Sequence, residues 1–234
     1  MEQIYSIPVN EAFDRVRGGK ECACPFCVLY NKLEEDELDI ILGASMMEPD
    51  IRIKTNEQGF CDRHFARMLK RKRMLGLGLI MQSHLGEVSK LLEGPSVAIN
   101  RRTASVSGVK ELAADCYVCA RIKHNLDAMI ATAVYLYDTD SEFNKKFTEA
   151  PYFCLPHYAA MTEYASKKLP RAKFAAIFDD AKRVNTEYLK TLSGDVDWFC
   201  KKFDYRYDEE PWYNSKDSLP RAIKFLAGDM SSQD

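Results

Sequence analysis

The strongest constraint on this chain is a pattern of cysteines and histidines that occurs twice. The first copy is Cys24-Pro-Phe-Cys27 with Cys61-Asp-Arg-His64, and the second is Cys116-Tyr-Val-Cys119 with Cys154-Leu-Pro-His157. Within each copy, the Cys-x-x-His pair begins 34 or 35 positions after the Cys-x-x-Cys pair ends. Six of the eight cysteines belong to this pattern, so an internal repeat organises the sequence.

The likeness between the copies extends beyond these residues. A phenylalanine, Phe60 or Phe153, precedes the later cysteine, and a methionine, Met68 or Met161, lies four residues past the histidine. We therefore expect two tandem copies within one compact unit. The predicted segments are 1–93 with the first repeat, a linker over 94–113 rich in small and polar residues, the second repeat over 114–193, and an aromatic C-terminal segment over 194–234.

Three cysteines and one histidine form a common closed ligand set for structural zinc. Cysteine and histidine three apart at a helix start share one face, and the helix end favours thiolate. We expect each copy to close one site as a helical hairpin, giving two zinc ions per chain. The predicted ligands are Cys24, Cys27, Cys61, His64, Cys116, Cys119, Cys154 and His157. Four protein ligands leave no open position, which favours a non-catalytic scaffold or interaction protein without catalytic residues.

Three other interpretations stay open for these residues. They can be buried thiols with satisfied histidines, or they can hold an iron–sulfur cluster, which also uses cysteine with histidine. They can also form a thiol-based redox switch or oxidoreductase, with Cys22 as an extra thiol, although no βαβ pattern of a thioredoxin-like fold surrounds either motif.

Apolar residues recur near a 3.6-residue period and no segment alternates as a strand does, so the predicted fold class is all-α with antiparallel helix pairs. The first copy is expected to form helices over 26–42 and 49–53, and one long helix over 61–92 bent at Gly76–Gly78. The second is expected to form helices over 118–137, 141–147 and 154–168, followed by another after Pro170.

Bulk properties narrow the location and the partners. The net charge is −2, so no global basic field favours nucleic acid, although Arg67, Lys70, Arg71, Lys72 and Arg73 form a local basic run. We interpret that run as a solvated helix surface. No apolar stretch is long enough to span a membrane, and residues 1–10 lack a signal-peptide pattern, so a cytoplasmic protein is expected.

The remaining candidate residues lie outside the repeat. Cys200 is expected to be a small buried hydrophobe, and His84 and His124 are expected to be ordinary surface or core histidines. We expect the fold to end in a C-terminal helical and aromatic cap. Residues 197–217 contain both tryptophans with interleaved charge, which is typical of either such a cap on the core or a surface for a protein partner.

The motif order Cys-Pro-Phe-Cys, Gly-Phe-Cys-Asp-Arg-His, Cys-Tyr-Val-Cys, Phe-Cys-Leu-Pro-His, then Lys202-Phe-Asp-Tyr-Arg206 and Pro211-Trp212, resembles an uncharacterised bacterial family of about this length. The family is a domain of unknown function, and the resemblance covers nearly the whole chain. It implies a bacterial cytosolic protein with paired metal motifs and supplies no activity. Where this family has glycine after Pro-Trp, the chain has Tyr213.

Overall fold

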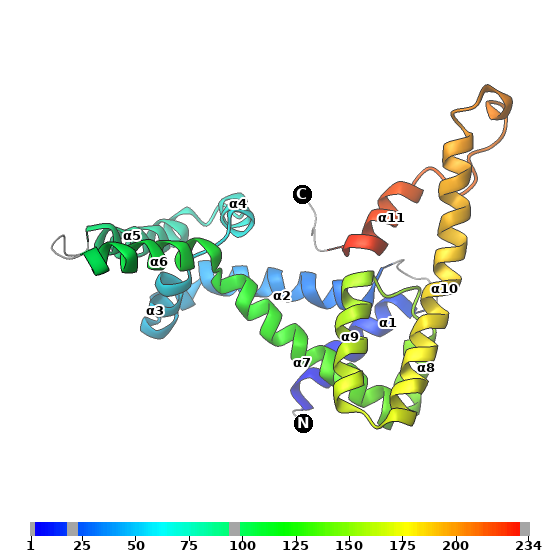
Figure 1. The fold of residues 1–234 in the computed structure, drawn as a ribbon, viewed down its shortest axis with the longest axis horizontal. Helices are drawn as coiled ribbons and strands as arrows, with labels where there is room; N and C mark the ends of the chain where they lie inside the picture. The colour runs from blue at the N-terminus through cyan, green and yellow to red at the C-terminus, as the bar shows by residue number, and fades with distance from the viewer. Residues whose placement is uncertain (1–2, 18–22, 94–98, 230–234) are drawn as a thin grey trace. The chain divides into compact units, whose positions relative to one another are not determined.

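The computed structural model describes residues 3–17, 23–93 and 99–229, and every regular element among them is a helix (Figure 1). The all-α prediction is therefore confirmed. The elements are η1 Gln3–Tyr5, α1 Ser6–Val16, α2 Pro25–Leu42, η3 Ala44–Met47, α3 Pro49–Gln58, α4 Asp62–Lys70, α5 Met74–Glu93, α6 Ile99–Ala114, α7 Tyr117–Thr139, α8 Ser141–Thr148, α9 Leu155–Lys168, α10 Arg171–Lys201, η4 Tyr205–Tyr207 and α11 Ser218–Ala227. None of these helices is long and apolar enough to cross a membrane.

The chain forms two compact units that interleave along the sequence. The inner unit is residues 32–125, and the outer unit combines residues 1–31 with 126–234. Both divisions fall inside helices, so α2 begins in the outer unit and ends in the inner one, while α7 does the reverse. Each unit consequently contains parts of both sequence copies.

An aromatic cluster forms the core of the outer unit. Helix α1 was not predicted from the sequence, and it contributes Phe13 to this cluster. The centre of the Phe13 ring lies 4.7 to 6.3 Å from the ring centres of four other phenylalanines. Those four are Phe26, Phe143, Phe147 and Phe153. All five side chains are fully buried. Since burying one phenylalanine contributes about 1.5–3 kcal/mol, this cluster holds together α1, α2, α8 and the segment before α9.

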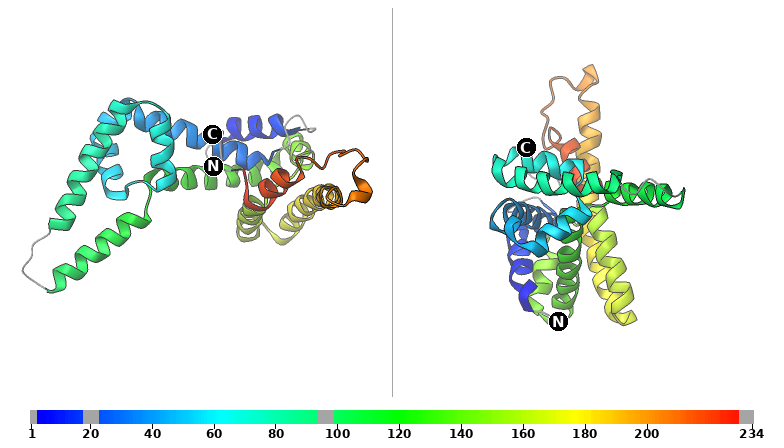
Figure 2. Two further views of the ribbon diagram at one scale, coloured as in Figure 1. Left: turned by 90° about the horizontal axis from the view of Figure 1, so that it is seen from above. Right: turned by 90° about the vertical axis from the view of Figure 1, so that its left-hand side faces the viewer.

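The second layer of the outer unit is built on α10. Figure 2 shows α9 beside α10, and α11 folds back onto both helices. Phe225 of α11 is buried, and its ring contacts those of Tyr152 and Tyr188, which stack on one another at 4.3 Å. The C-terminal helix therefore does cap the core, as a helical cap was expected to do.

The aromatic residues before α11 pack mainly on each other, at the far end of α10 (Figure 1). The ammonium of Lys202 donates to the backbone carbonyls of Tyr207, Asp208 and Glu210, at 2.5, 2.9 and 2.7 Å. Tyr213 has a φ of 48°, in the left-handed region that glycine adopts most easily. Tyr213 thus forms a left-handed turn although it carries a side chain, and its ring packs on Trp198.

The inner unit corrects the prediction of a single helix over 61–92. Helix α4 ends at Lys70 and α5 begins at Met74, so the break precedes the glycines at which a bend was expected. Lys72, with a φ of 57°, turns the chain between the two helices. Gly76 and Gly78 lie inside α5. Leu75 and Leu85, two apolar residues within the range of the predicted long helix, are exposed on α5.

The predicted linker over 94–113 is largely helical. Residues 94–98 lie outside the described residues, but Ile99–Ala114 forms α6, which packs against α5. A Cβ at Gly108 would approach the Leu91 side chain to 2.9 Å, so glycine allows the two helices to lie close together. Gly108, one of the small residues that suggested a linker, therefore serves helix packing instead.

Candidate metal centres

The four ligand pairs meet in a crossed arrangement. The outer cluster contains Cys24, Cys27, Cys154 and His157, and the inner cluster contains Cys61, His64, Cys116 and Cys119. Within each cluster the four donor atoms lie within 4.8 Å of one another, so each can hold a metal ion. All eight predicted ligands are brought together, but the expectation that each sequence copy closes its own site is wrong.

Helix lengths explain the crossing. From its Cys-x-x-Cys pair, the chain leaves along α2 or α7, whose 18 and 23 residues rise about 27 and 35 Å. The helix that leads to each Cys-x-x-His pair, α3 or α8, has only 10 or 8 residues and rises about 15 or 12 Å. This shorter helix cannot retrace the whole length of α2 or α7, and each Cys-x-x-His pair meets the other copy instead.

The outer cluster has the dimensions of one tetrahedral ion. With metal–sulfur bonds of about 2.3 Å and metal–nitrogen bonds of about 2.0–2.1 Å, the tetrahedron edges are about 3.8 Å between sulfurs and about 3.6 Å from sulfur to nitrogen. Here the Sγ atoms of Cys27 and Cys154 are 3.6 Å apart. His157 Nδ1 lies 3.8, 3.5 and 3.1 Å from the sulfurs of Cys24, Cys27 and Cys154, respectively.

The inner cluster has nearly the same edges. His64 Nδ1 lies 3.2 Å from the sulfurs of both Cys61 and Cys116, and 3.4 Å from that of Cys119. The Sγ atoms of Cys61 and Cys119 are 3.9 Å apart. In both clusters the histidine therefore presents Nδ1 to three sulfurs, which is the donor set of a closed site without a position for water.

Each cluster lies at the start of two helices. Cys61 and Cys154 are the N-cap residues of α4 and α9, while Cys24 and Cys116 immediately precede α2 and α7. The partial positive charge at a helix start favours thiolate over thiol, and thiolate is the form that binds metal. The folding of four helices thus delivers ionisable sulfur to the two points where it is needed.

The outer cluster is enclosed by protein. All four of its ligand residues are buried, and the ring of Phe26 packs against that of His157. The backbone amide of Asp229 donates to Cys27 Sγ at 3.2 Å. Burial opposes ionisation of Cys24, but hydrogen bonds with Cys154, Cys27 and His157 outweigh it and hold the pKa of this thiol well below its usual value.

Asn185 of α10 positions the backbone just before Cys154 of the outer cluster. Its side chain accepts a hydrogen bond from the Phe153 amide at 2.8 Å and donates to the Phe153 carbonyl at 2.9 Å. Both groups are buried, and a buried backbone group requires such a partner. Helix α10 therefore fixes the backbone immediately before Cys154.

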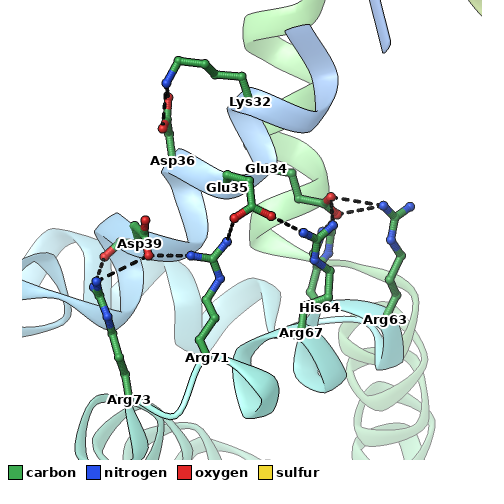
Figure 3. Close-up of polar contacts among 10 residues, drawn as sticks. All are labelled: Lys32, Glu34, Glu35, Asp36, Asp39, Arg63, His64, Arg67, Arg71 and Arg73. Atoms are coloured by element: carbon green, nitrogen blue, oxygen red, sulfur yellow. Dashed lines mark hydrogen bonds and ion pairs between the residues drawn. The ribbon is translucent and has the colours of Figure 1, made fainter. Parts of the chain in front are cut away.

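A buried carboxylate orients the histidine of the inner cluster. Glu34 of α2 is fully buried and its Oε1 lies 3.0 Å from His64 Nε2, while Arg63 and Arg67 pair with the same carboxylate (Figure 3). Burial would raise the pKa of Glu34, but His64 and the two arginines outweigh it and lower that pKa. An ionised Glu34 accepts a hydrogen bond from Nε2–H, and in this tautomer the lone pair of Nδ1 faces the sulfurs.

The same contacts shift the pKa values inside the inner cluster. Burial disfavours the charged imidazole, yet hydrogen bonds with Cys116 and Glu34 raise the pKa of His64 to about 9. Burial also opposes ionisation of Cys116, but the hydrogen bond with His64 and one to the Cys119 backbone lower its pKa to about 6. Burial and the neighbouring charge of Cys116 raise the pKa of Cys119. Three crowded thiols and an imidazole of this kind are suited to share one cation.

Comparison with known families decides the identity of the chain. Residues 1–233 match the sequence pattern of DUF6062, a family of unknown function. The chain belongs to the DUF6062 family. The resemblance to an uncharacterised family of this length is therefore confirmed. Comparison with curated proteins finds no match, and comparison with solved structures finds none.

The basic run of this DUF6062 protein is largely engaged in ion pairs with α2. Arg67 pairs with Glu34 and Glu35, and Arg71 pairs with Glu35 and Asp39 (Figure 3). Arg73 also lies near Asp39 and donates to its backbone carbonyl at 3.1 Å. These contacts neutralise much of the positive charge that suggested a phosphate-binding surface.

The other candidate residues lie outside both clusters. Cys200 is exposed on α10, which corrects the expectation that it is buried. His84 and His124 take no part in either cluster. Cys22 lies outside the described residues.

Sequence reasoning missed the residues that surround the ligands, namely Glu34, Asn185 and Asp229. Glu34 belongs to the run Glu34-Glu35-Asp36-Glu37, which is typical of a solvated helix face. The available signal was charge complementarity, because Arg67 and Arg71 stand four residues apart on a helix, as Glu35 and Asp39 do. Nothing in the sequence marks Asn185 or Asp229.

Proposed function

We propose that this protein binds two zinc ions in closed Cys₃His sites and acts as a helical scaffold for a protein partner, with no catalytic centre of its own. The observation that carries the proposal is the pair of four-donor clusters whose edges match a tetrahedron around one ion. Donor atoms this close together suit a single ion better than an iron–sulfur cluster, which separates its protein ligands by several atoms.

Zinc is expected to stabilise both units directly. Each ion would join two helix starts that are far apart in sequence, so that metal binding supplies part of the folding free energy. The crossed ligands add to this effect, because each ion ties one sequence copy to the other. The outer site would also anchor the aromatic core through Phe26 and Phe153, the neighbours of its cysteines.

The surface proposed for the partner is the aromatic tip, residues 197–217, at the end of α10. Phe203, Tyr205 and Tyr213 are exposed there at 75%, 84% and 68%. Lys202 fixes the loop that carries them. Rigid exposed aromatic side chains are the residues that most often anchor protein interfaces. The ion pairs of the basic run make the same protein a poorer candidate for binding nucleic acid.

Metal analysis combined with visible absorption tests the zinc proposal. Protein purified without added metal is expected to contain about two zinc ions per chain and no visible band. Cys24→Ser and Cys116→Ser are each expected to reduce the content to about one zinc. A visible absorption band with iron, or a wild-type content well below one zinc, would refute the proposal.

A further inference from the structure

The two clusters share a ligand set but differ in their access to solvent. In the outer cluster all four ligand residues are buried, with Cys24 and Cys154 at 0% exposure and Cys27 at 1%. In the inner cluster Cys119 is exposed and Cys61 is partly exposed. Only the inner cluster therefore has an exposed ligand residue.

Packing reinforces this difference. Cys27 of the outer cluster accepts a hydrogen bond from the amide of Asp229, and Phe26 lies against His157, so the segment after α11 and the aromatic core both contact that cluster. In the inner cluster, Glu34 holds His64 and is itself paired with Arg63 and Arg67, but Cys119 is exposed. The histidine of the inner cluster is therefore fixed, while one of its cysteines is exposed.

We propose that the inner cluster is an oxidation-sensitive metal site, which a hydroperoxide attacks at Cys119, while the outer cluster keeps its metal. This inference rests on the proposed zinc binding and adds a regulatory role to one of the two sites. Susceptibility of a cysteine to oxidation follows its thiolate character and its exposure, and of the six cysteines in the two clusters only Cys119 is both a potential metal thiolate and exposed.

The chemistry balances with hydrogen peroxide as the oxidant. The Cys119 thiolate attacks one peroxide oxygen, which forms a sulfenic acid and releases hydroxide as the O–O bond breaks. A second thiolate of the cluster then attacks the sulfenic sulfur, which forms a disulfide and releases a second hydroxide. The Cys61 sulfur is 3.9 Å away and is the partner that we assign. Two protons convert the hydroxides to water, and zinc, having lost two ligands, leaves as the aqueous ion.

The consequence would be local to the inner unit. The inner ion joins the start of α4 to the start of α7, so its loss removes the link between these helices. The ion pairs from α4 to Glu34, Glu35 and Asp39 of α2 do not involve the metal and would persist. We therefore expect the α7 end of the inner unit to loosen while the outer unit stays folded.

The test is peroxide titration of the zinc-loaded full chain, with released zinc measured by a chromophoric chelator and cysteines mapped by differential alkylation. The first zinc is expected to leave about tenfold faster than the second, together with loss of free Cys119 and Cys61. The exposed Cys200, which is outside both clusters, reports that peroxide has reacted. Release of both ions at one rate, or first modification of Cys24, Cys27 or Cys154, would overturn the inference.

Two variants that each retain one intact cluster provide a second test, which does not depend on mapping the cysteines by alkylation. Cys116→Ser, which leaves the outer cluster intact, is expected to retain its zinc under peroxide, and Cys24→Ser is expected to lose its zinc as the first wild-type ion does. If Cys24→Ser fails to fold, the wild-type mapping still decides. A wild-type chain that contains two zinc ions and keeps both after Cys200 is oxidised contradicts this inference alone, whereas a chain without zinc contradicts the proposed function.

Discussion

Glu34 illustrates how one side chain changes the chemistry of a ligand that it does not replace. Its carboxylate accepts from His64 Nε2 and is itself held by Arg63 and Arg67. A hydrogen bond of this kind fixes the tautomer and orientation of the imidazole, and it makes the other ring nitrogen a better donor. Among the described contacts of the outer cluster, no carboxylate does the same for His157.

Replacement of Glu34 should therefore weaken the inner site selectively. Glu34→Gln keeps the size of the side chain but removes its charge, and we expect zinc affinity at the inner site to fall about 10–100-fold. Competition with a graded series of chelators measures the affinity of each site. Glu35→Gln is the matched control, because Glu35 also pairs with Arg67 but does not contact His64. An equal loss of affinity in both variants would show that the ion pairs, rather than the contact with His64, matter.

At the scale of elements, α10 both supports the outer site and carries the aromatic tip. Asn185 near its middle positions the backbone of Phe153, while Lys202 at its end holds the following loop by three backbone carbonyls. Lys202 is only 7% exposed, and its ammonium also lies 5.4 Å from the centre of the Trp212 ring. The loop is too short to form a hydrophobic core of its own, and the buried ammonium of Lys202 holds it in place instead.

Removing that cation should loosen the tip without disturbing the metal. In Lys202→Met the three carbonyls lose their donor, and each buried hydrogen bond lost costs about 1–3 kcal/mol. We expect amide hydrogen exchange over residues 203–215 to become about tenfold or more faster, with zinc content unchanged. Lys201→Met, which removes an exposed lysine paired with Asp197, should leave exchange in the loop as it is. Unchanged exchange in Lys202→Met would mean that the aromatic contacts alone hold the loop.

The extent to which the fold was predictable differs among the elements. The apolar period located α2, α7, α8 and α9 within a few residues, because each buries one face of a helix. The break between α4 and α5 was not predictable from a period alone, since it depends on a single left-handed residue, Lys72. The composition of residues 94–113 suggested a loop, but Gly108 there permits close helix packing.

The sequence predicted which residues take part in the candidate sites, but not which pairs of them meet. Residue types and spacing identified all eight residues of the two clusters, because the pattern follows what a tetrahedral ion would need, namely soft donors in pairs that one helix turn can supply. Which pair meets which is a property of the path between them, and that path depends on the relative lengths of α2 and α3, and of α7 and α8. Periodicity could not reveal that the return helices are too short.

At the scale of the whole molecule, the crossed pairing predicts how a cut chain behaves. A protease site inserted into residues 94–98 would separate the first sequence copy from the second after purification. Because each half holds one pair from both clusters, the two fragments are expected to stay together while zinc is bound and to separate when a strong chelator removes it. Size-exclusion chromatography with and without the chelator measures this.

The cut chain also distinguishes the two possible pairings. If each copy closed its own site, both fragments would retain zinc after they had been separated in mild denaturant. With crossed pairing, neither isolated fragment has a complete set of ligands, and both should lose their zinc. The same chain with the inserted site left uncut provides the control for the insertion itself.

The crossed pairing also determines the order in which the two clusters become complete during synthesis. All four residues of the inner cluster lie, in sequence, between the two pairs of the outer cluster. The outer cluster begins at Cys24 and is complete only when the chain reaches His157. As the ribosome extends the chain, the first cysteine pair emerges without a partner and must wait until both pairs of the inner set have appeared. If the clusters bind zinc as proposed, the nascent protein acquires its first ion only after Cys119 has emerged and its second only after His157 has, so that an incomplete chain carries unpaired thiols for most of its synthesis.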